Sequence, residues 1–497
     1  MKKLLSILFS STLLMVSCSD DDTTDSPVII DGEEYTSGSA DFSNYVSVGN
    51  SLTAGYSDQA LFIEGQTNSF PNMLATKFAL AGGGDFSIPF MADNLGGATL
   101  GGQTILGNRL FLDFSTGSPN PVPVSGTGTT EISNVLSGPF NNMGVPGSKI
   151  FHLAAPGYGN VQGVALGLAN PYYARFASSS DATIIGDAVA QNPTFFSLWT
   201  GSNDILSFAL AGGAGEDQTG NPDPSTYGSN DITDPDVFAY TYNALLQGLT
   251  ANGAKGVTAN IPNVTSLPHF TTVPHNPVPL DEATAAQLNA GFAAYNNGLL
   301  YFQSLNLLTA DEVAKRTISF TAGTSNPVVI LDEDLTDLTA YNAALTNMRQ
   351  ATAEDLIVLT ARSFIGSVVN NNPALINGVS VPLEDKWVLT PEEQTMITTA
   401  TVSYNQTIAA LAGQYGLAFF DANSYLEVVA TTGVGLTDGS TVTSTYATGG
   451  AFSLDGVHPS PRGYALIANQ FTAAINTTFG SNLPDTDPLE YKGLYIN

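Results

Sequence analysis

Short apolar runs alternate with longer amphipathic stretches along most of the chain. The short runs are rich in aromatic and β-branched residues and are bounded by Gly, Asn or Pro, as buried strands are. They span residues 45–48, 194–199, 256–262, 327–331 and 417–421. The longer stretches predict helices over about 70–80, 233–249, 285–302, 391–415 and 461–475. Strands and helices that alternate in this way predict an α/β fold, with a parallel sheet and helices on both faces.

Local signals mark where several of these elements begin. Thr390-Pro391-Glu392-Glu393 is a capping box with Pro at the first helical position, and Ser460-Pro461 caps the last helix. The run Ile105–Leu112, with Gly107-Asn108 at its centre, predicts a β-hairpin with a two-residue turn.

Small polar residues follow the ends of the predicted strands. The first strand stops at Gly49, and Ser51 comes two residues later. In open α/β sheets the carboxyl edge of the strands is where ligands bind. Ser51 is therefore a candidate nucleophile, and the alternative is a serine that only caps the next helix.

Four blocks that carry potentially reactive side chains follow one another along the chain. They are Gly49-Asn50-Ser51-Leu52, Asn141–Ser148, Trp199–Asp204 and Asp455–Pro459. In this order they resemble the SGNH (GDSL-type) ester hydrolase family over roughly residues 42–480. The resemblance implies a three-layer α/β/α, flavodoxin-like fold with large insertions. It also implies catalytic roles for Ser51, Gly147, Asn203, Asp455 and His458.

One position departs from the family pattern. Asn50 stands where the family usually has Asp, so the turn keeps its hydrogen-bonding capacity but loses a charge. The Gly-x-Ser-x-Gly nucleophile elbow of the other large α/β hydrolase group is absent from the sequence.

The implied residues supply the parts that ester hydrolysis needs. Ser51 would be the nucleophile and His458 its base, because imidazole changes charge near neutral pH. Asp455 would accept the Nδ1 proton of the imidazole and stabilise the imidazolium. The backbone N–H groups of Ser51 and Gly147 and the side-chain amide of Asn203 would bind the oxyanion.

The spacing of these blocks predicts one large domain over residues 41–480, with insertions at about 60–135 and 275–385 and a tail at 481–497. The first insertion carries apolar residues that would form either an acyl groove or lid, or only its own small core: Phe86, Ile88, Phe90, Met91, Leu110, Phe111 and Leu112. The second carries Asp332-Glu333-Asp334, for which a solvated turn is favoured over a calcium site.

Composition narrows the classes of function. The formal net charge of −30 argues against nucleic-acid binding, which needs a basic face. The other histidines, His152, His269 and His275, lack metal-ligand spacing, so we expect ordinary loop histidines, with His269 and His275 bordering the site as the alternative. The sequence therefore predicts neither a metal nor a cofactor.

The N-terminus has the features of an exported lipoprotein. Residues 1–17 contain two lysines and then a run that is apolar except for Ser and Thr, which predicts a signal peptide too short for a membrane span. Cys18, the sole cysteine, follows a lipobox-like stretch and is the expected lipidation site. Residues 18–40 then form an acidic tether. We expect an outer-membrane lipoprotein exposed at the cell surface, with no further membrane span.

The resemblance implies a serine ester hydrolase but does not choose its substrate. A lipid-like acyl ester is the favoured substrate if the apolar residues of the first insertion face the site. A carbohydrate O-acetylesterase is the alternative enzyme. A surface-binding lipoprotein with a catalytically silent hydrolase fold is the alternative from another class.

Overall fold

The protein is an α/β protein built on a five-stranded parallel sheet. The structure, a computed structural model, describes residues 29–30, 33–115 and 119–496. The central strands are β3 (Tyr45–Gly49), β9 (Asn142–Gly144), β10 (Phe195–Trp199), β11 (Lys255–Ala259) and β16 (Ala418–Phe420). Their spatial order is β16-β11-β10-β3-β9, and every neighbouring pair is parallel. The predicted strands over 45–48, 194–199, 256–262 and 417–421 are confirmed.

Successive residues of each central strand point to opposite faces, which is why the runs are apolar throughout. On β10, Phe195 and Trp199 join one core cluster, whereas Phe196 and Leu198 join the other. Both faces of the sheet are therefore buried.

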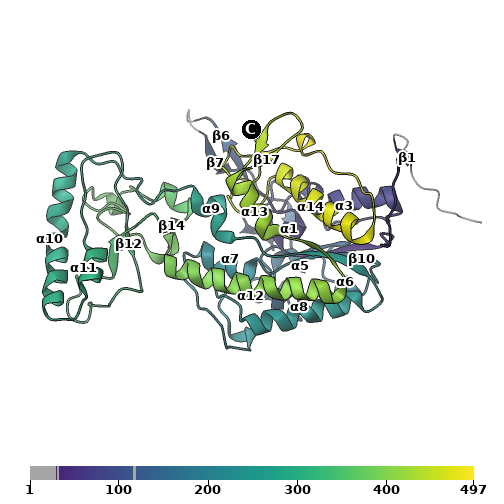
Figure 1. Cartoon of the computed structure of the whole chain (residues 1–497), viewed down its shortest axis with the longest axis horizontal. Helices are drawn as coiled ribbons and strands as arrows, with labels where there is room; N and C mark the ends of the chain where they lie inside the picture. The colour runs from purple at the N-terminus through teal and green to yellow at the C-terminus, as the bar shows by residue number, and fades with distance from the viewer. Residues whose placement is uncertain (1–28, 31–32, 116–118, 497) are drawn as a thin grey trace, which may run out of the picture.

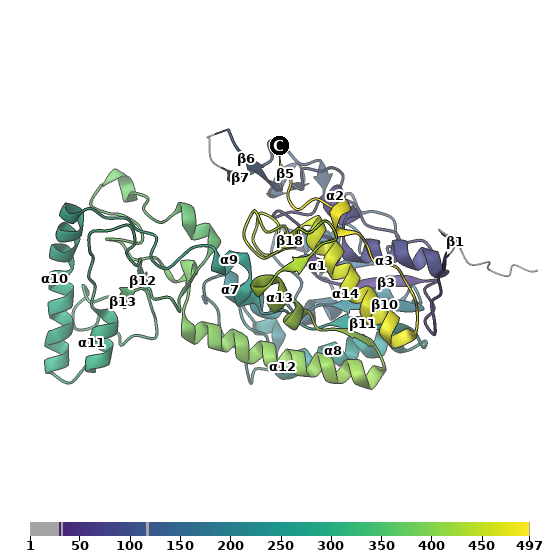
Figure 2. The ribbon, with the colours of Figure 1, turned by 45° about the horizontal axis from the view of Figure 1, so that its top comes forward.

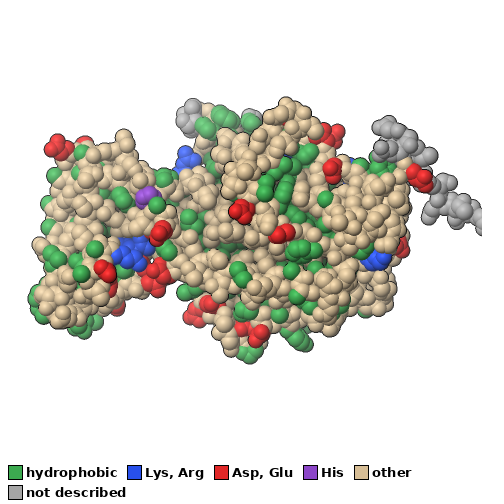
Figure 3. All heavy atoms as spheres, viewed as in Figure 1, with side chains coloured by type: hydrophobic (Ala, Val, Ile, Leu, Met, Phe, Trp, Pro, Cys, Tyr) green, Lys and Arg blue, Asp and Glu red, His purple; other side chains and the backbone are tan. Residues whose placement is uncertain are grey.

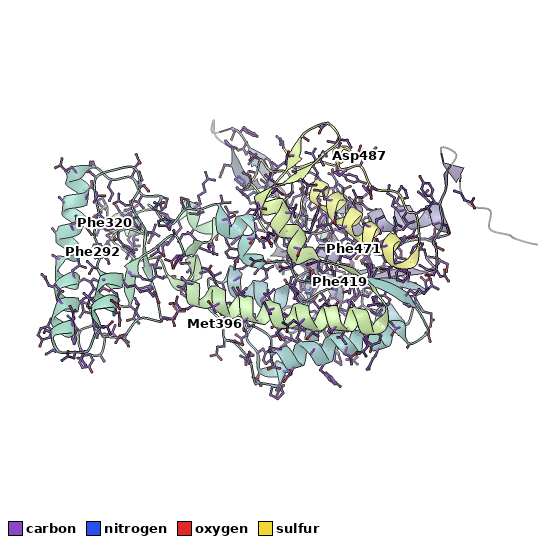
Figure 4. All side chains as sticks on the ribbon, viewed as in Figure 1. Phe292, Phe320, Met396, Phe419, Phe471 and Asp487 are labelled. Carbon is purple, nitrogen blue, oxygen red and sulfur yellow. The ribbon has the colours of Figure 1, made fainter. Side chains whose placement is uncertain are left out.

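Helices cover both faces (Figures 1 and 2). One face packs against α3 (Phe70–Phe78) and α14 (Pro461–Phe479), with Phe471 of α14 stacked on Phe70 (Figure 4). The other packs against α6 (Ile184–Val189), α7 (Asn203–Leu210), α8 (Pro235–Thr250) and α12 (Pro391–Tyr415). The other helices of the body are α1 (Ser51–Ala54), α2 (Ile63–Thr67), α4 (Val161–Val164), α5 (Pro171–Ala174), α9 (Pro268–Thr271) and α13 (Ala422–Thr431).

The segment between β3 and β9 forms two small sheets. Its strands are β4 (Ala98–Leu100), β5 (Gln103–Leu106), β6 (Leu110–Asp113), β7 (Asn120–Pro123) and β8 (Thr130–Glu131). The predicted hairpin over 105–112 is wrong, because β5 pairs with β4 and β6 pairs with β7. The two-residue turn lies instead at Gly101-Gly102, where φ is +59° and +78°. Both central residues of such a turn need positive φ, and two glycines meet that need at little cost.

Residues 275–389 form a side lobe that lies beyond the carboxyl edge of the sheet (Figures 1 and 2). The lobe contains α10 (Glu282–Ser304), α11 (Ala310–Arg316), β12 (Val329–Leu331), β13 (Met348–Gln350), β14 (Leu356–Ile357) and β15 (Val388–Leu389). Phe292 of α10 faces Phe320 with ring centroids 6.0 Å apart (Figure 4). The chain leaves the lobe through the capping box at Thr390 and enters α12, as predicted.

The acidic stretch in the lobe is not the simple solvated turn that the sequence favours. Asp332 is fully buried, and the guanidinium of Arg349 and the Nζ atom of Lys315 contact its carboxylate. Arg349 also binds both carboxylate oxygens of Asp355 at 2.7 Å. Burial alone raises the pKa of Asp332, but Arg349 and Lys315 outweigh burial and hold it below its ordinary value. Glu333 and Asp334 are exposed.

The chain enters the body of the molecule beside the far end of α14. The Ser39 N–H donates to the Phe479 carbonyl at 2.8 Å, and Asn482 bonds the Thr36 N–H at 2.7 Å. The predicted signal peptide (1–17) and the lipidation site Cys18 lie outside the described residues, as does most of the tether. Within the described part of the chain, no helix has the length and hydropathy of a membrane span.

Candidate active site

The candidate residues meet at the carboxyl edge of the three neighbouring strands β9, β3 and β10. Along the chain, β3 is followed by β9 on one side and then by β10 on the other, so the connections diverge between β3 and β10. This point of divergence is where doubly wound sheets bind ligands. Ser51 begins α1 two residues after β3, and Asn203 begins α7 four residues after β10.

Ser51, His458 and Asp455 form a continuous hydrogen-bonded chain. The Oγ atom of Ser51 lies 2.9 Å from Nε2 of His458. Nδ1 of His458 lies 2.9 Å from Oδ2 of Asp455. Both distances are within the range for strong hydrogen bonds, so a proton on Ser51 Oγ has a direct acceptor. The structure thus brings together the three residues that the sequence proposed as a triad, although His458 is 407 positions from Ser51.

The Asp455 side chain is only 10% exposed and is yet held as a carboxylate. It accepts hydrogen bonds from the N–H groups of Gln59 (3.0 Å), Val457 (2.8 Å) and His458 (2.8 Å) and from the Ser453 hydroxyl (3.0 Å). Burial works to raise the pKa of Asp455, but the neighbouring His458 and these hydrogen bonds outweigh it and hold the pKa well below its usual range. The imidazole ring therefore faces an anionic, fixed acceptor.

A strained turn that the sequence did not single out supports this loop. Asp58 and Gln59 have φ of +49° and +67°, which non-glycine residues rarely adopt. The Asp58 carboxylate accepts from the Leu454 N–H at 2.8 Å, while its own N–H donates to Ser453 Oγ at 2.9 Å. The turn thereby fixes the loop that carries Asp455. These contacts join residues almost 400 positions apart, so no local sequence signal could have found them.

Three N–H donors at this edge have no acceptor among the described residues. They are the backbone N–H groups of Ser51 and Gly147 and the second amide hydrogen of Asn203, whose first donates to the Ser148 carbonyl at 2.9 Å. Gly147 has φ of +79°, a conformation that favours glycine. Asn50 caps α1 by accepting from the Leu52 N–H at 3.1 Å, so the residue that departs from the family pattern keeps its role in the turn.

Asp204 is a second positioning residue that sequence reasoning did not assign. It is fully buried, and its carboxylate accepts from the Ile150 N–H at 2.9 Å and from the Thr233 hydroxyl at 2.7 Å. It thereby ties the loop that follows Gly147 to α7, which carries Asn203. Burial raises the pKa of Asp204 to about 7.

His269 borders the site, so the expectation of an ordinary loop histidine is wrong for this residue. It is buried, its N–H donates to the Gly456 carbonyl at 2.9 Å, and its ring lies 3.3 Å from the Asp455 carbonyl. Gly456 has φ of +72°, and a Cβ atom there would lie 3.0 Å from the His269 backbone. Tyr56 packs on the other side, with its ring 4.6 Å from that of His458.

A cavity of about 90 Å³, partly open to solvent, lies against Ser51, Asn203 and His458. Its other walls are almost entirely apolar: Trp199, Leu206, Val264, Leu267, Phe420, Leu426, Val429, Leu466 and Ile467. They come mainly from β16, α13 and α14, and hydrophobic side chains also gather at the surface over α13 and α14 (Figure 3). The arrangement places the Ser51 hydroxyl at the wall of an apolar cavity.

The apolar residues of the segment between β3 and β9 do not line this cavity. Phe86 packs on Tyr45 with ring centroids 5.1 Å apart, and Ile88, Met91 and Leu112 are buried within the segment or against the body. For these residues the core interpretation holds, and the acyl-groove interpretation is wrong for this cavity.

No metal-ligating cluster lies at the triad within the described residues. The grouping whose geometry could hold a metal ion is Glu333, Asp385 and Glu393, at the junction of the side lobe and α12.

Comparison of the chain with protein-family models, with curated proteins and with solved structures found no match. Function is therefore argued from the geometry of the site.

Proposed function

We propose that the protein is a carboxylic-ester hydrolase that uses Ser51, His458 and Asp455 as a catalytic triad. The observation that carries the proposal is the hydrogen-bonded chain from Ser51 Oγ through His458 to the Asp455 carboxylate. A histidine that contacts a serine hydroxyl on one side and a carboxylate on the other can remove the serine proton as the oxygen attacks.

The reaction would proceed in two halves. Ser51 Oγ attacks the ester carbonyl while His458 takes its proton, and the oxyanion is bound by the free N–H groups of Ser51, Gly147 and Asn203. The C–O bond to the alcohol then breaks, and His458 returns the proton to the leaving alcohol. Water attacks the acyl-enzyme in the same way and releases the carboxylic acid and free Ser51.

The cavity favours an apolar acyl group over acetylated sugar. Each methylene buried there would contribute about 0.8 kcal/mol to binding, whereas the hydroxyl groups of a sugar need polar partners that the apolar walls lack. Acyl lipids and other apolar esters are thus the proposed substrate class, and a carbohydrate O-acetylesterase is the weaker candidate. A silent binding protein would not need Ser51 and His458 within 2.9 Å.

We also propose that the chain is an SGNH-type hydrolase of flavodoxin-like fold. The strand order supports this assignment, because numbering the central strands along the chain gives the order 2-1-3-4-5 across the sheet. The four sequence blocks support it as well, since all four lie at the carboxyl edge or in the loop that faces it.

A fluorophosphonate probe tests the proposal directly, since it reacts with a serine only when that serine is activated. The full chain should be labelled and should hydrolyse p-nitrophenyl esters, and Ser51→Ala should abolish both without lowering Tm. Ser202→Ala is the matched control for labelling, because Ser202 also lines the cavity but has no histidine contact among the described residues. Labelling that survived Ser51→Ala would assign the nucleophile elsewhere.

A further inference from the structure

Three carboxylates converge where the side lobe meets the body. Glu333 follows β12, Asp385 begins a short 3₁₀ turn (Asp385–Trp387), and Glu393 lies in the first turn of α12. Each offers one carboxylate oxygen, and these oxygens lie within 4.8 Å of one another. Acidic and basic side chains gather at this junction on the surface (Figure 3).

The three carboxylates lack a compensating cation among the described residues. The nearby basic groups are engaged elsewhere: Lys315 contacts Asp332 and Glu392, Arg349 binds Asp332 and Asp355, and Lys386 contacts Glu384. Like charges held this close, one of them on the buried Glu393, need a counter-charge.

Glu393 gives an independent indication of a missing partner. Its side chain is only 3% exposed. One carboxylate oxygen accepts from the Thr390 N–H at 2.6 Å and completes the capping box. The other, Oε1, is buried and has no hydrogen-bond partner among the described residues. A buried carboxylate oxygen without a partner is costly, which points to a ligand that the oxygen would bind.

We propose that Glu333, Asp385 and Glu393 bind a calcium ion. An all-oxygen, carboxylate-rich set suits a hard divalent cation. The three oxygens lie within 4.8 Å of one another, close enough for one ion to bind them all, and Ca²⁺ accepts irregular oxygen geometry whereas Mg²⁺ demands a near-ideal octahedron. Glu333 is exposed and provides the route by which the ion enters. The proposal replaces the sequence-based expectation that the chain holds no metal.

The ion would fasten the lobe to the start of α12, beside the end of α7. Gly212 and Gly213 follow α7 and press against the cluster: a Cβ atom on Gly212 would lie 2.2 Å from the Asp385 carbonyl, and one on Gly213 would overlap the Glu393 carboxylate. The site therefore joins the lobe, α12 and the end of α7. This is a structural role, and it stands apart from the hydrolytic reaction of Ser51.

Titration of CaCl₂ into the full chain, first stripped of metal with a chelator, tests the site. Calorimetry measures the binding, and the thermal midpoint measures the stabilisation. We expect one strong binding event and a saturable rise in Tm. Glu333→Gln should weaken binding about 10-fold or more and remove the rise, and it should fold because Glu333 is exposed. Glu354→Gln, which neutralises an exposed carboxylate on the same lobe, is the matched control and should bind as the unmodified protein does.

Three results would overturn the proposal. They are the absence of heat and of a Tm change at millimolar Ca²⁺, unchanged binding by Glu333→Gln, and equal affinity for Mg²⁺. If Glu333→Gln does not fold, Asp385→Asn carries the same test. Neither readout uses ester hydrolysis, so failure of the calcium site and failure of the proposed hydrolase are separately visible.

Discussion

At the scale of single residues, the site depends on how firmly a few polar atoms are held. The Asp455 carboxylate is fixed by backbone and hydroxyl donors from its own loop and by the Gln59 N–H from the opposite side. It therefore stays ionised and correctly placed although it is largely buried. His458 in turn keeps one nitrogen on Asp455 and presents the other to Ser51.

Asn203→Ala tests the proposed oxyanion donor. The loss of one donor aimed at developing charge typically lowers kcat by about 10²–10³, and we expect a drop of that size with little change in KM. Asn203→Asp, which keeps the side-chain volume but cannot donate, should show a similar loss. Steady-state kinetics on p-nitrophenyl butyrate decide it, and a rise in KM at constant kcat would assign Asn203 to substrate binding instead.

Asp58 makes stability depend on pH. Burial raises the pKa of Asp58 to about 7 from an ordinary 3.8, so the folded state holds this proton more tightly than the unfolded state does. The stabilisation that comes from protonated Asp58 is present below pH 4 and is lost as the pH rises through 7. It amounts to about 1.4 kcal/mol for each unit by which folding raises the pKa.

Asp58→Asn should remove the part of the pH-dependent loss of stability that comes from residue 58. Asn tolerates the left-handed backbone of residue 58 and keeps the acceptor for the Leu454 N–H. Scanning calorimetry between pH 4 and 8 should therefore show a shallower fall of Tm in the variant. An identical pH profile for both proteins would contradict the assignment of the proton to Asp58.

At the scale of elements, α13 and α14 shape the cavity and so should set the acyl length. Ile467 lies half-buried on α14 and lines the cavity. Ile467→Trp would fill it, and we expect kcat/KM for octanoyl esters to fall relative to acetyl esters, by about fourfold for each methylene excluded. Leu411→Trp, at a half-buried position on α12 outside the cavity lining, should leave the chain-length profile unchanged. A preference of the unmodified protein for acetyl esters would favour the O-acetylesterase.

Sequence signals correctly predicted the elements whose starts depend only on neighbouring residues. The capping box at Thr390 and the Ser460-Pro461 cap start α12 and α14 as expected. The hairpin at Gly107-Asn108 failed because a turn sequence does not say which strands pair. There, Asn108 donates to the carbonyls of Val124 and Gly126, which lie beyond β7 and outside the predicted hairpin.

At the scale of the whole molecule, local motifs again do not say which distant segments contact one another, and this decides how much of the site the sequence could show. The order of the four blocks identified residues that the fold brings together at one edge of the sheet. It did not identify Asp58 and gave a place beside the site for His269 only as the alternative, because the roles of both come from contacts with a loop near residue 455. Nor did it locate the cavity, whose walls come from helices near the end of the chain.

The lipoprotein proposal is also tested on the whole molecule. Cys18→Ala should abolish lipidation and release the protein from membrane fractions, because the chain would lose its acyl anchor. Fractionation followed by blotting measures the release, and Ser17→Ala serves as a control that keeps the thiol. Mass spectrometry that found a mature N-terminus other than a modified Cys18 would contradict the proposal.

The point at which the chain enters the body has a consequence for reach. Thr36 and Ser39 are pinned at the far end of α14, and His458 lies just before its near end. A helix of 19 residues is about 28 Å long, so the N-terminal segment and the triad lie at opposite ends of α14. If the chain is anchored at Cys18, the triad would therefore lie on the side of the body that faces away from the membrane. It would then meet esters that arrive from the surroundings before those of its own bilayer.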